Sequence, residues 1–252
     1  GCAFFSKGLD CVRVDGDCNL AGIEKLCEFL PPYDHEAWTD SSRRFLSFHK
    51  MNLIRVFGSD WRRKFASLCK SRMKKWGFNT VACWSDLGLA DAIGMPFTYI
   101  FGGSMLTERR LFRDFPDVFS PEYSTVCEEW AKQIIPFANN DRLIGYFLGN
   151  EPQWAFVNDL NLAALLLESG RELVSFGVMI DWLREKYQRI DELNVAWETK
   201  FSDFGEISAV KTEKAVADQW EFTRVMIREY MRVPSEAIRK YDPNHLNLGI
   251  RY

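Results

Sequence analysis

Glu151 is the residue whose type and position best suit acid–base chemistry in this sequence. It lies in the tripeptide Asn150-Glu151-Pro152, directly after the apolar run from Leu143 to Leu148. Such a run predicts a buried parallel strand, and in parallel α/β folds the reactive groups follow the carboxyl ends of the strands. A carboxyl group placed there can act as a general acid or base. The tripeptide also suits a helix start, because Asn caps helices well and Pro is favoured in a first turn.

Other polar and aromatic residues follow predicted strands in the same way. They are Trp84 and Asp86 after one strand, and Arg251-Tyr252 after another. The ring faces of Trp84 and Trp154 suit the apolar C–H side of a sugar ring, although packing explains each of them equally well. Asp86 suits either a hydroxyl ligand or a helix cap, with the cap favoured. Arg251 suits either the neutralisation of a carboxylate or an ion pair at the strand ends.

The elements that must position these residues alternate along the chain. Helical spacing of apolar residues and local stop signals predict helices over 65–76, 120–138, 173–187 and 213–241. Strands are predicted over 3–9, 78–84, 96–101, 142–149 and 246–252. Alternating strands and helices favour an α/β fold with a parallel sheet. Residues from about 11 to 63 are expected to form an insertion with little regular structure after the first strand.

Composition limits the function classes. The chain has 252 residues, 47% of them hydrophobic, which suits one large α/β domain. The formal charge is −3 with both signs interspersed, so nothing predicts a nucleic-acid partner. No run approaches the roughly 20 apolar residues that cross a bilayer, and a soluble protein without a membrane partner is expected. The oligomeric state and the compartment are not indicated.

Cysteine and histidine spacing does not predict a metal site. The seven cysteines form no Cys-x-x-Cys pair, and His35, His49 and His245 lie far apart. All seven cysteines lie within the first 127 residues of a chain that is large enough to fold without disulfides, and most are expected to be free and buried. The segment Phe101-Gly102-Gly103-Ser104 lacks the glycine spacing of a nucleotide-binding loop, which argues against a nucleotide-dependent enzyme.

Two segments near the start, Phe4 to Leu9 and Asn52 to Trp61, resemble those of a known family, the clan A barrel glycosidases of the β-galactosidase and β-agarase-like branch. Phe4 to Leu9 is similar to the Phe-Phe-Ser-x-Gly opening strand of agarase-like members. Asn52 to Trp61, continuing to Trp76–Thr80 and Trp84-Ser85-Asp86, resembles their helix-to-strand passage. This second segment is the most specific match.

A third segment extends the resemblance to most of the chain. Gly149 to Pro152, with Trp182–Tyr187 and Leu193–Trp197 downstream, resembles the part of β-galactosidase-like barrels around and after strand four. The chain departs from the agarase-like pattern at Val56-Phe57, where those members tend to have Lys-Tyr, and at Ala82-Cys83. These departures leave the glycan open.

The resemblance implies a (β/α)8 TIM barrel, present over residues 1–252 as about its first five strands. It implies that Glu151 is the general acid/base and that Asn150 binds the 2-hydroxyl of the sugar. The nucleophilic Glu of the family follows strand seven, so it is expected beyond residue 252, and the isolated chain is expected to be inactive. Retaining glycosidases need both carboxyls, about 5–5.5 Å apart.

The leading hypothesis is therefore a retaining glycoside hydrolase that takes an oligosaccharide or polysaccharide substrate and needs no cofactor. β-Galactosides and agar-type oligosaccharides are the expected glycans. Trp84, Asp86, Asn150, Trp154, Arg251 and Tyr252 are the candidate substrate-binding residues. An agarase-like role would imply a secreted or periplasmic protein. The alternative is a non-catalytic glycan-binding barrel, which would keep the aromatic residues but could lack the nucleophile.

Overall fold

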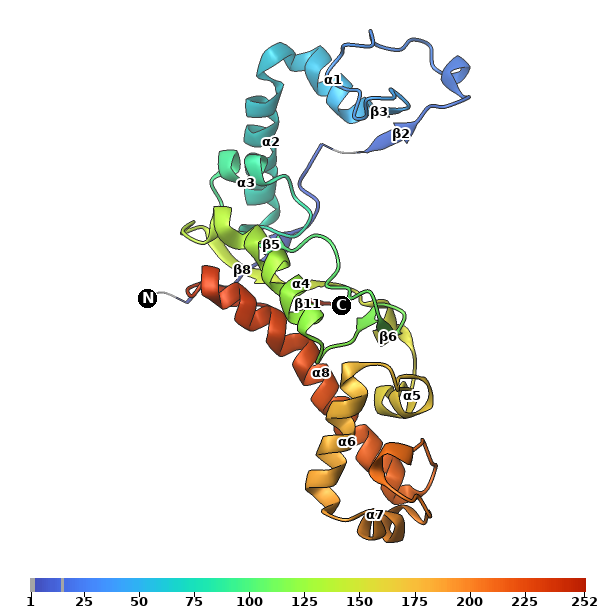
Figure 1. The fold of residues 1–252 in the computed structure, drawn as a ribbon. Coiled ribbons are helices and arrows are strands. Elements are labelled where there is room, and N and C mark those ends of the chain that lie inside the picture. Colours follow the sequence, from blue (N-terminus) through green and yellow to red (C-terminus); the bar gives the residue numbers. More distant parts are fainter. Residues whose placement is uncertain (1–2, 15) are drawn as a thin grey trace. The chain divides into compact units, whose positions relative to one another are not determined.

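The computed structural model describes residues 3–14 and 16–252. The chain divides into two compact units, which Figure 1 shows with the elements labelled. Unit 1 comprises residues 1–99 and 141–145, and unit 2 comprises residues 100–140 and 146–252. The strands and helices alternate as the sequence predicts. The fold is therefore of the α/β class, and two of the strand pairs in the main sheet are parallel.

The main sheet has the strand order β1-β4-β5-β8-β10. In unit 1, β1 pairs with β4 in parallel, with Gly8 opposite Thr80, and β4 pairs with β5 in parallel, with Val81 opposite Phe97. The strands are short: β1 is Gly8–Leu9, β4 Thr80–Val81, β5 Phe97–Ile100, β8 Leu143–Phe147 and β10 Leu246–Asn247.

Unit 1 adds helices and a hairpin to its strands. The helices α1 (Phe48–Phe57), α2 (Trp61–Trp76) and α3 (Leu87–Ile93) follow one another, with the 3-10 turn η2 (Gly58–Asp60) before α2. Gly77 ends α2 in a left-handed conformation with φ 79°, as a helix-terminating glycine should. β2 (Asp17–Asn19) and β3 (Phe45–Ser47) form an antiparallel pair, and the 3-10 turn η1 (Glu24–Leu26) lies between them in the sequence.

Unit 2 is mostly helical. After the hairpin β6 (Arg110–Phe112) and β7 (Phe115–Pro116) come α4 (Pro121–Ala131), η3 (Lys132–Phe137), β9 (Gly149–Asn150) and η4 (Gln153–Phe156). The rest consists of α5 (Leu162–Ser169), α6 (Val174–Tyr187), α7 (Ile190–Trp197), η5 (Phe204–Glu206), α8 (Glu213–Tyr241) and β11 (Ile250–Arg251). Ser120 caps α4 by accepting a hydrogen bond from the backbone N–H of Tyr123, as its position before Pro121 predicts.

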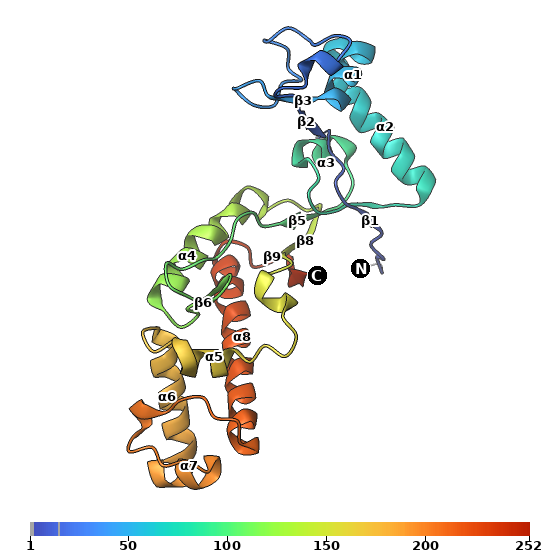
Figure 2. The same ribbon diagram turned by 90° about the vertical axis from the view of Figure 1, so that its right-hand side faces the viewer.

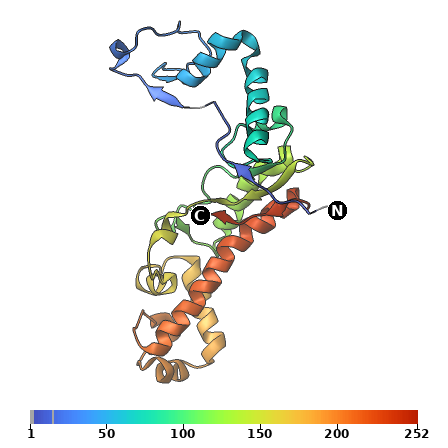
Figure 3. The same ribbon diagram turned by 180° about the vertical axis from the view of Figure 1, so that it is seen from behind.

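The long helix α8 organises the core of unit 2. It packs against α4 and α5 and also contacts α7, and Figures 2 and 3 show it running past these helices. Its inward residues Phe222, Met226 and Ile238 are fully buried. Asp218 is also fully buried on α8, where it accepts hydrogen bonds from Trp197 Nε1 at 2.8 Å and Lys214 Nζ at 2.8 Å.

The expectation for the first strand was wrong in length and burial. Only Gly8 and Leu9 are in a strand, and the Phe4 and Phe5 side chains are 55% and 78% exposed. Both residues precede Gly8, the first residue that pairs with β4, so strand pairing does not cover them. The last expected strand is interrupted as well, because Gly249, with φ 78°, separates β10 from β11.

The insertion at 11–63 is more regular than the sequence predicts. It contains the β2–β3 hairpin and α1, and it has a small core of its own made by Leu20, Ala37, Leu46 and Met51. These apolar residues are too widely spaced along the chain to show a helical or strand period. Only the folded arrangement brings them together.

The cysteines are free, as predicted, in the part of the chain that the structure describes, but most are not buried. Cys83 and Cys127 are buried, Cys11 is exposed, and Cys18, Cys27 and Cys69 are in between. Cys2 lies outside the described residues. None of the described helices is both long and apolar enough to cross a membrane.

Candidate functional site

Glu151 lies at the end of a parallel strand pair in unit 2. β9 pairs with β11 in parallel, with Gly149 opposite Ile250 and Asn150 opposite Arg251. The pair is extended by one bond, because the Glu151 N–H donates to the Arg251 carbonyl at 3.0 Å. The strand β8 precedes this site, so Glu151 follows the carboxyl end of a sheet strand, as the sequence predicts. The Glu151 side chain is exposed.

Glu151 has a left-handed backbone conformation with φ 45°. Its Cβ makes this conformation cost about 1–2 kcal/mol relative to a right-handed one. Such a conformation persists where the surrounding structure fixes it, and it is found most often at functional sites. The helix-start interpretation of the tripeptide is partly correct, because Pro152 is the N-cap of the short 3-10 turn η4 that follows Glu151.

The β6–β7 hairpin holds the residues that follow Glu151. The two oxygens of Asp114 accept hydrogen bonds from the backbone N–H groups of Gln153 at 2.8 Å and Trp154 at 2.9 Å. Arg113 Nη1 donates to the Gln153 carbonyl at 2.9 Å. The turn of the hairpin therefore holds the first residues of η4 in place through these three hydrogen bonds. Arg113 itself has a left-handed φ of 49°, as a tight two-residue turn allows.

Trp154 packs among aromatic rings. Its ring lies edge-on to Phe115 with centroids 5.2 Å apart and edge-on to Tyr230 with centroids 5.5 Å apart. Burial raises the pKa of Tyr230 to about 12, so this phenol is neutral at physiological pH. The packing interpretation of Trp154 thus has direct contacts in its favour, and any sugar contact has to use the part of the ring that these neighbours leave exposed.

Arg251 and Tyr252 also lie at this site. Arg251 Nη1 donates to the side-chain oxygen of Asn150 at 3.2 Å, across the β9–β11 pair. The Tyr252 hydroxyl donates to the Ala155 carbonyl at 2.8 Å, and its ring stacks on Phe156 with centroids 5.2 Å apart. Unit 2 therefore brings Asn150, Glu151, Trp154, Arg251 and Tyr252 to one end of the β9–β11 pair.

A small cavity of about 60 Å³ lies beside these residues. Its walls combine the segment after β5 with the β9 and hairpin residues; they include Ser104, Met105, Asp114, Asn150, Pro152 and Tyr230. Asp114 and Asn150 thus face the same space. The volume is below the roughly 300 Å³ of a small-molecule pocket, so this cavity alone is too small to hold a sugar ligand.

Trp84 and Asp86 belong to unit 1. Asp86 caps α3, because its Oδ1 accepts from the Leu89 N–H at 3.1 Å, and this confirms the cap interpretation. Its side chain also lines two adjoining cavities of about 360 and 250 Å³. Trp84 has a left-handed φ of 57° and is half-buried.

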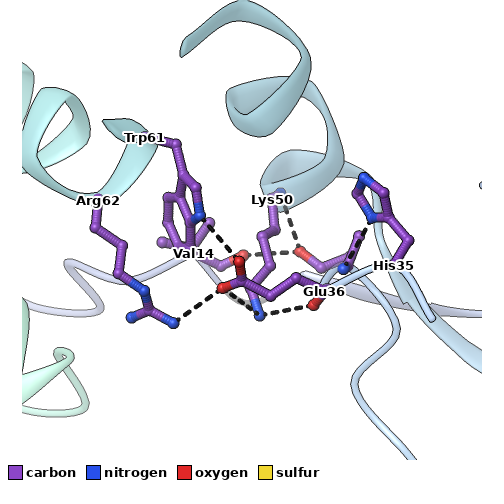
Figure 4. Close-up of polar contacts among 8 residues, drawn as sticks. Val14, His35, Glu36, Lys50, Trp61 and Arg62 are labelled. Atoms are coloured by element: carbon purple, nitrogen blue, oxygen red, sulfur yellow. Dashed lines mark hydrogen bonds and ion pairs between the residues drawn. The ribbon is translucent and has the colours of Figure 1, made fainter. Parts of the chain in front are cut away.

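One wall of these two cavities is a compact polar cluster, shown in Figure 4. The Glu36 carboxylate accepts hydrogen bonds from Trp61 Nε1 at 3.3 Å and Arg62 Nη2 at 3.2 Å, and Lys50 Nζ donates to the Glu36 carbonyl at 3.1 Å. Burial raises the pKa of Glu36, but the hydrogen bonds from Trp61 and Arg62 outweigh it and hold the pKa below its usual value. Trp61 and Arg62, which bond to Glu36, line both cavities together with Asp86, and Lys50 lines the smaller one.

The described residues contain no group of three or more His, Cys, Asp or Glu side chains that could hold a metal ion. Sequence reasoning missed Asp114 and Arg113. The signal that could have found them is local: two polar residues stand between the apolar pairs Leu111-Phe112 and Phe115-Pro116, a pattern typical of a hairpin turn. Nothing in the sequence connects that turn with Gln153, about 40 residues later.

A carboxyl group at the carboxyl end of a parallel strand, in a chain that alternates strands and helices, is the arrangement of an α/β barrel enzyme. The comparison with protein families specifies the class. A family of glycoside hydrolases, family 42, described as Beta-galactosidase, matches residues 112–248, which is more than half of the chain. The chain belongs to this glycoside hydrolase family.

Curated relatives extend the similarity over the whole chain. Beta-agarase B of Vibrio sp. (strain JT0107) is 23% identical over 99% of this chain and 31% of its own length. Beta-agarase A of the same strain is 24% identical over 100% of this chain and 29% of its own length. The chain therefore spans less than a third of the length of either relative.

Solved structures show the same fold. The structure of an agarase matches with a TM-score of 0.79 at 21% identity, over 99% of this chain and 42% of that one. An exo-beta-agarase matches with a TM-score of 0.73 at 24% identity, over 89% of this chain and 36% of that one. At these identities the similarity establishes the fold, which is the α/β fold of barrel glycosidases, and each match covers less than half of the barrel protein's chain.

Proposed function

We propose that the protein carrying this chain is a retaining glycoside hydrolase of β-linked galactose-containing glycans, with Glu151 as its general acid/base. The observation that carries the proposal is the position of Glu151. It follows the parallel pair β9–β11 in a left-handed conformation, within the segment that matches the glycoside hydrolase family. The glycans are suggested by the Beta-galactosidase family and by the beta-agarase relatives.

In the proposed reaction, the protonated Glu151 donates its proton to the glycosidic oxygen as the bond from that oxygen to the anomeric carbon breaks. A second carboxylate attacks the anomeric carbon and forms a glycosyl-enzyme. Glu151, now ionised, then takes a proton from the water molecule that hydrolyses this intermediate. The proposal places the nucleophile beyond residue 252, in keeping with the span of less than a third of the curated relatives.

Asn150 is proposed to bind the sugar 2-hydroxyl. Arg251 Nη1 donates to the Asn150 side-chain oxygen, so we assign the Asn150 Nδ2 group as the donor to the hydroxyl. A hydrogen bond there adds to the rate if it strengthens in the transition state. Arg251 and Tyr252 support the site through Asn150 and η4, respectively. Trp84, Trp154 and Asp86 remain proposed glycan contacts, and Asp86 has a second carboxylate oxygen beyond the one that caps α3.

The test compares wild type with Glu151→Gln in the protein produced from the full open reading frame. Gln keeps the shape but cannot donate the proton, so hydrolysis of agar oligosaccharides and of a phenyl β-galactoside should fall by about a hundredfold or more. The matched control is Glu198→Gln, because Glu198 is also exposed and also left-handed, with φ 57°. The control should keep wild-type activity.

A second variant tests the assigned step. Glu151→Ala, supplied with azide and a dinitrophenyl β-galactoside, should regain activity and release a β-glycosyl azide, because this leaving group needs no acid and azide attacks the glycosyl-enzyme without needing a general base. Full activity of Glu151→Gln would refute the acid/base role. If wild type binds agar oligosaccharides but cleaves neither substrate, the alternative of a non-catalytic glycan-binding barrel becomes the better account.

A further inference from the structure

The short turn after Glu151 has no cap from its own sequence. η4 begins after Pro152, whose side chain cannot accept a hydrogen bond, and no side chain of that segment caps its N–H groups. The first N–H groups of any helical turn need acceptors from elsewhere. Here both oxygens of Asp114 meet this need, one for Gln153 and one for Trp154. The cap therefore comes from the β6–β7 hairpin, in which Asp114 lies 39 residues before Gln153 and 40 residues before Trp154.

The same contacts fix the backbone on one side of Glu151. On the other side, the Glu151 N–H is bound to the Arg251 carbonyl at 3.0 Å. Glu151 thus lies between two anchors, the β9–β11 pair before it and the Asp114 carboxylate after it, with Pro152 as the only residue between Glu151 and the second anchor. A left-handed conformation at a residue with a Cβ is disfavoured, so it relaxes when an anchor is lost.

We infer that Asp114 is a positioning residue for the acid/base Glu151. It acts through the backbone of Gln153 and Trp154, and it fixes the direction in which the Glu151 carboxyl leaves the strand end. Arg113, which donates to the Gln153 carbonyl at 2.9 Å, strengthens the same anchor. The inference rests on the proposed function, since it assigns Asp114 to the proton-transfer step of that reaction.

The charge and both oxygens of Asp114 matter for this role. A carboxylate accepts two N–H bonds at once, whereas an Asn side chain has a single acceptor oxygen and an NH2 group that would face a donor. Asp114→Asn keeps the size of the side chain but breaks one of the two bonds. It should therefore loosen η4 without emptying the space that Asp114 fills beside Asn150 and Pro152.

The experiment uses the protein from the full open reading frame and a series of aryl β-galactosides. Phenyl galactosides need protonation of the leaving oxygen, whereas dinitrophenyl galactosides do not. If Asp114 positions the acid, Asp114→Asn should lower kcat/KM, which reports the glycosylation step, about tenfold or more on the phenyl substrate and about twofold or less on the dinitrophenyl substrate.

The matched control is Asp203→Asn. Asp203 also caps a 3-10 turn of unit 2, since it accepts a hydrogen bond from the Gly205 N–H at 2.6 Å, but its turn η5 carries no proposed catalytic residue. This control should leave the ratio of the two kcat/KM values unchanged. An equal loss on both substrates, or no loss on either, in Asp114→Asn would overturn the inference.

Glu151→Gln, run on the same two substrates, separates the inference from the proposed function. Glu151→Gln should show a larger preference for the dinitrophenyl substrate than Asp114→Asn does. If it shows none, the acid/base proposal itself fails. If Glu151→Gln is selective and Asp114→Asn is not, only the inference fails.

Hydrogen–deuterium exchange gives a readout that does not depend on the substrate. Asp114→Ala should speed amide exchange in a peptide spanning residues 150–157, because two N–H groups lose their acceptor, and Asp203→Asn should not. Unchanged exchange in this peptide would overturn the inference even if the activity had changed.

Discussion

Replacing Glu151 by Gly should make the protein no less stable while it removes the activity. The left-handed conformation of Glu151, with φ 45°, costs about 1–2 kcal/mol, and glycine avoids this cost because it has no Cβ. Glycine also makes the unfolded chain more flexible, which lowers the stability by about 0.5–1 kcal/mol and offsets part of this gain. The exposed Glu151 side chain contributes little packing. The expected net change is therefore a gain of about 0–1.5 kcal/mol.

Glu151→Ala is the reference variant, because alanine removes the carboxyl but keeps the Cβ. Its stability should stay close to that of the wild type, and Glu151→Gly should exceed it. A gain of 1 kcal/mol raises the melting temperature by about 2–4 °C in a protein of 150–250 residues, and by less in a longer chain, so urea unfolding followed by circular dichroism is the better assay.

Glu198→Gly is the matched control. Glu198 is the left-handed C-cap of α7, with φ 57° and ψ 46°, so the same substitution should give a gain of the same sign there without loss of activity. A Glu151→Gly protein that is less stable than Glu151→Ala would refute the reasoning. That result would mean that the left-handed conformation does not lower the stability of the folded protein at this position.

Two further predictions concern stability. Asp218→Ala should destabilise unit 2, because the buried Trp197 Nε1–H and Tyr187 hydroxyl would lose their acceptor at about 1–3 kcal/mol each. Burial raises the Asp218 pKa, but hydrogen bonds from Lys214, Tyr187, Trp197 and Lys186 outweigh it and hold the pKa below its ordinary value. The wild type should therefore lose stability as the pH falls below about 4, through the lowered pKa, and Asp218→Asn should show a shallower loss in urea unfolding at each pH. Gly8→Val should cost about 1–3 kcal/mol in the same assay, because a Cβ on Gly8 would lie 2.8 Å from the Ala82 Cβ, and an unchanged midpoint would contradict this packing.

Local signals in the sequence determined where two helices end, but they did not predict α1, α3 or α5, and α2 begins at Trp61 rather than at Phe65. The predicted helix at 213–241 has the bounds of α8, since Asp242-Pro243-Asn244 stops it, and Gly77 ends α2 where predicted. The position of Glu151 after a buried strand was also predicted, because a run of apolar residues followed by a polar tripeptide is a local pattern. Helix ends and strand ends depend mainly on residues within a few positions of them.

The tertiary structure alone decided how Glu151 is held. Its left-handed conformation is held by two long-range contacts. These are the parallel pairing of β9 with β11 and the hydrogen bonds that Asp114 accepts, and they join residues about 40 to 100 positions apart. No local pattern encodes such pairs. The length of each strand was decided in the same way, because a residue counts as part of a sheet only where a neighbouring strand pairs with it. The sequence therefore determined which residue stands at the strand end, and long-range contacts determined how the backbone on either side of it is held.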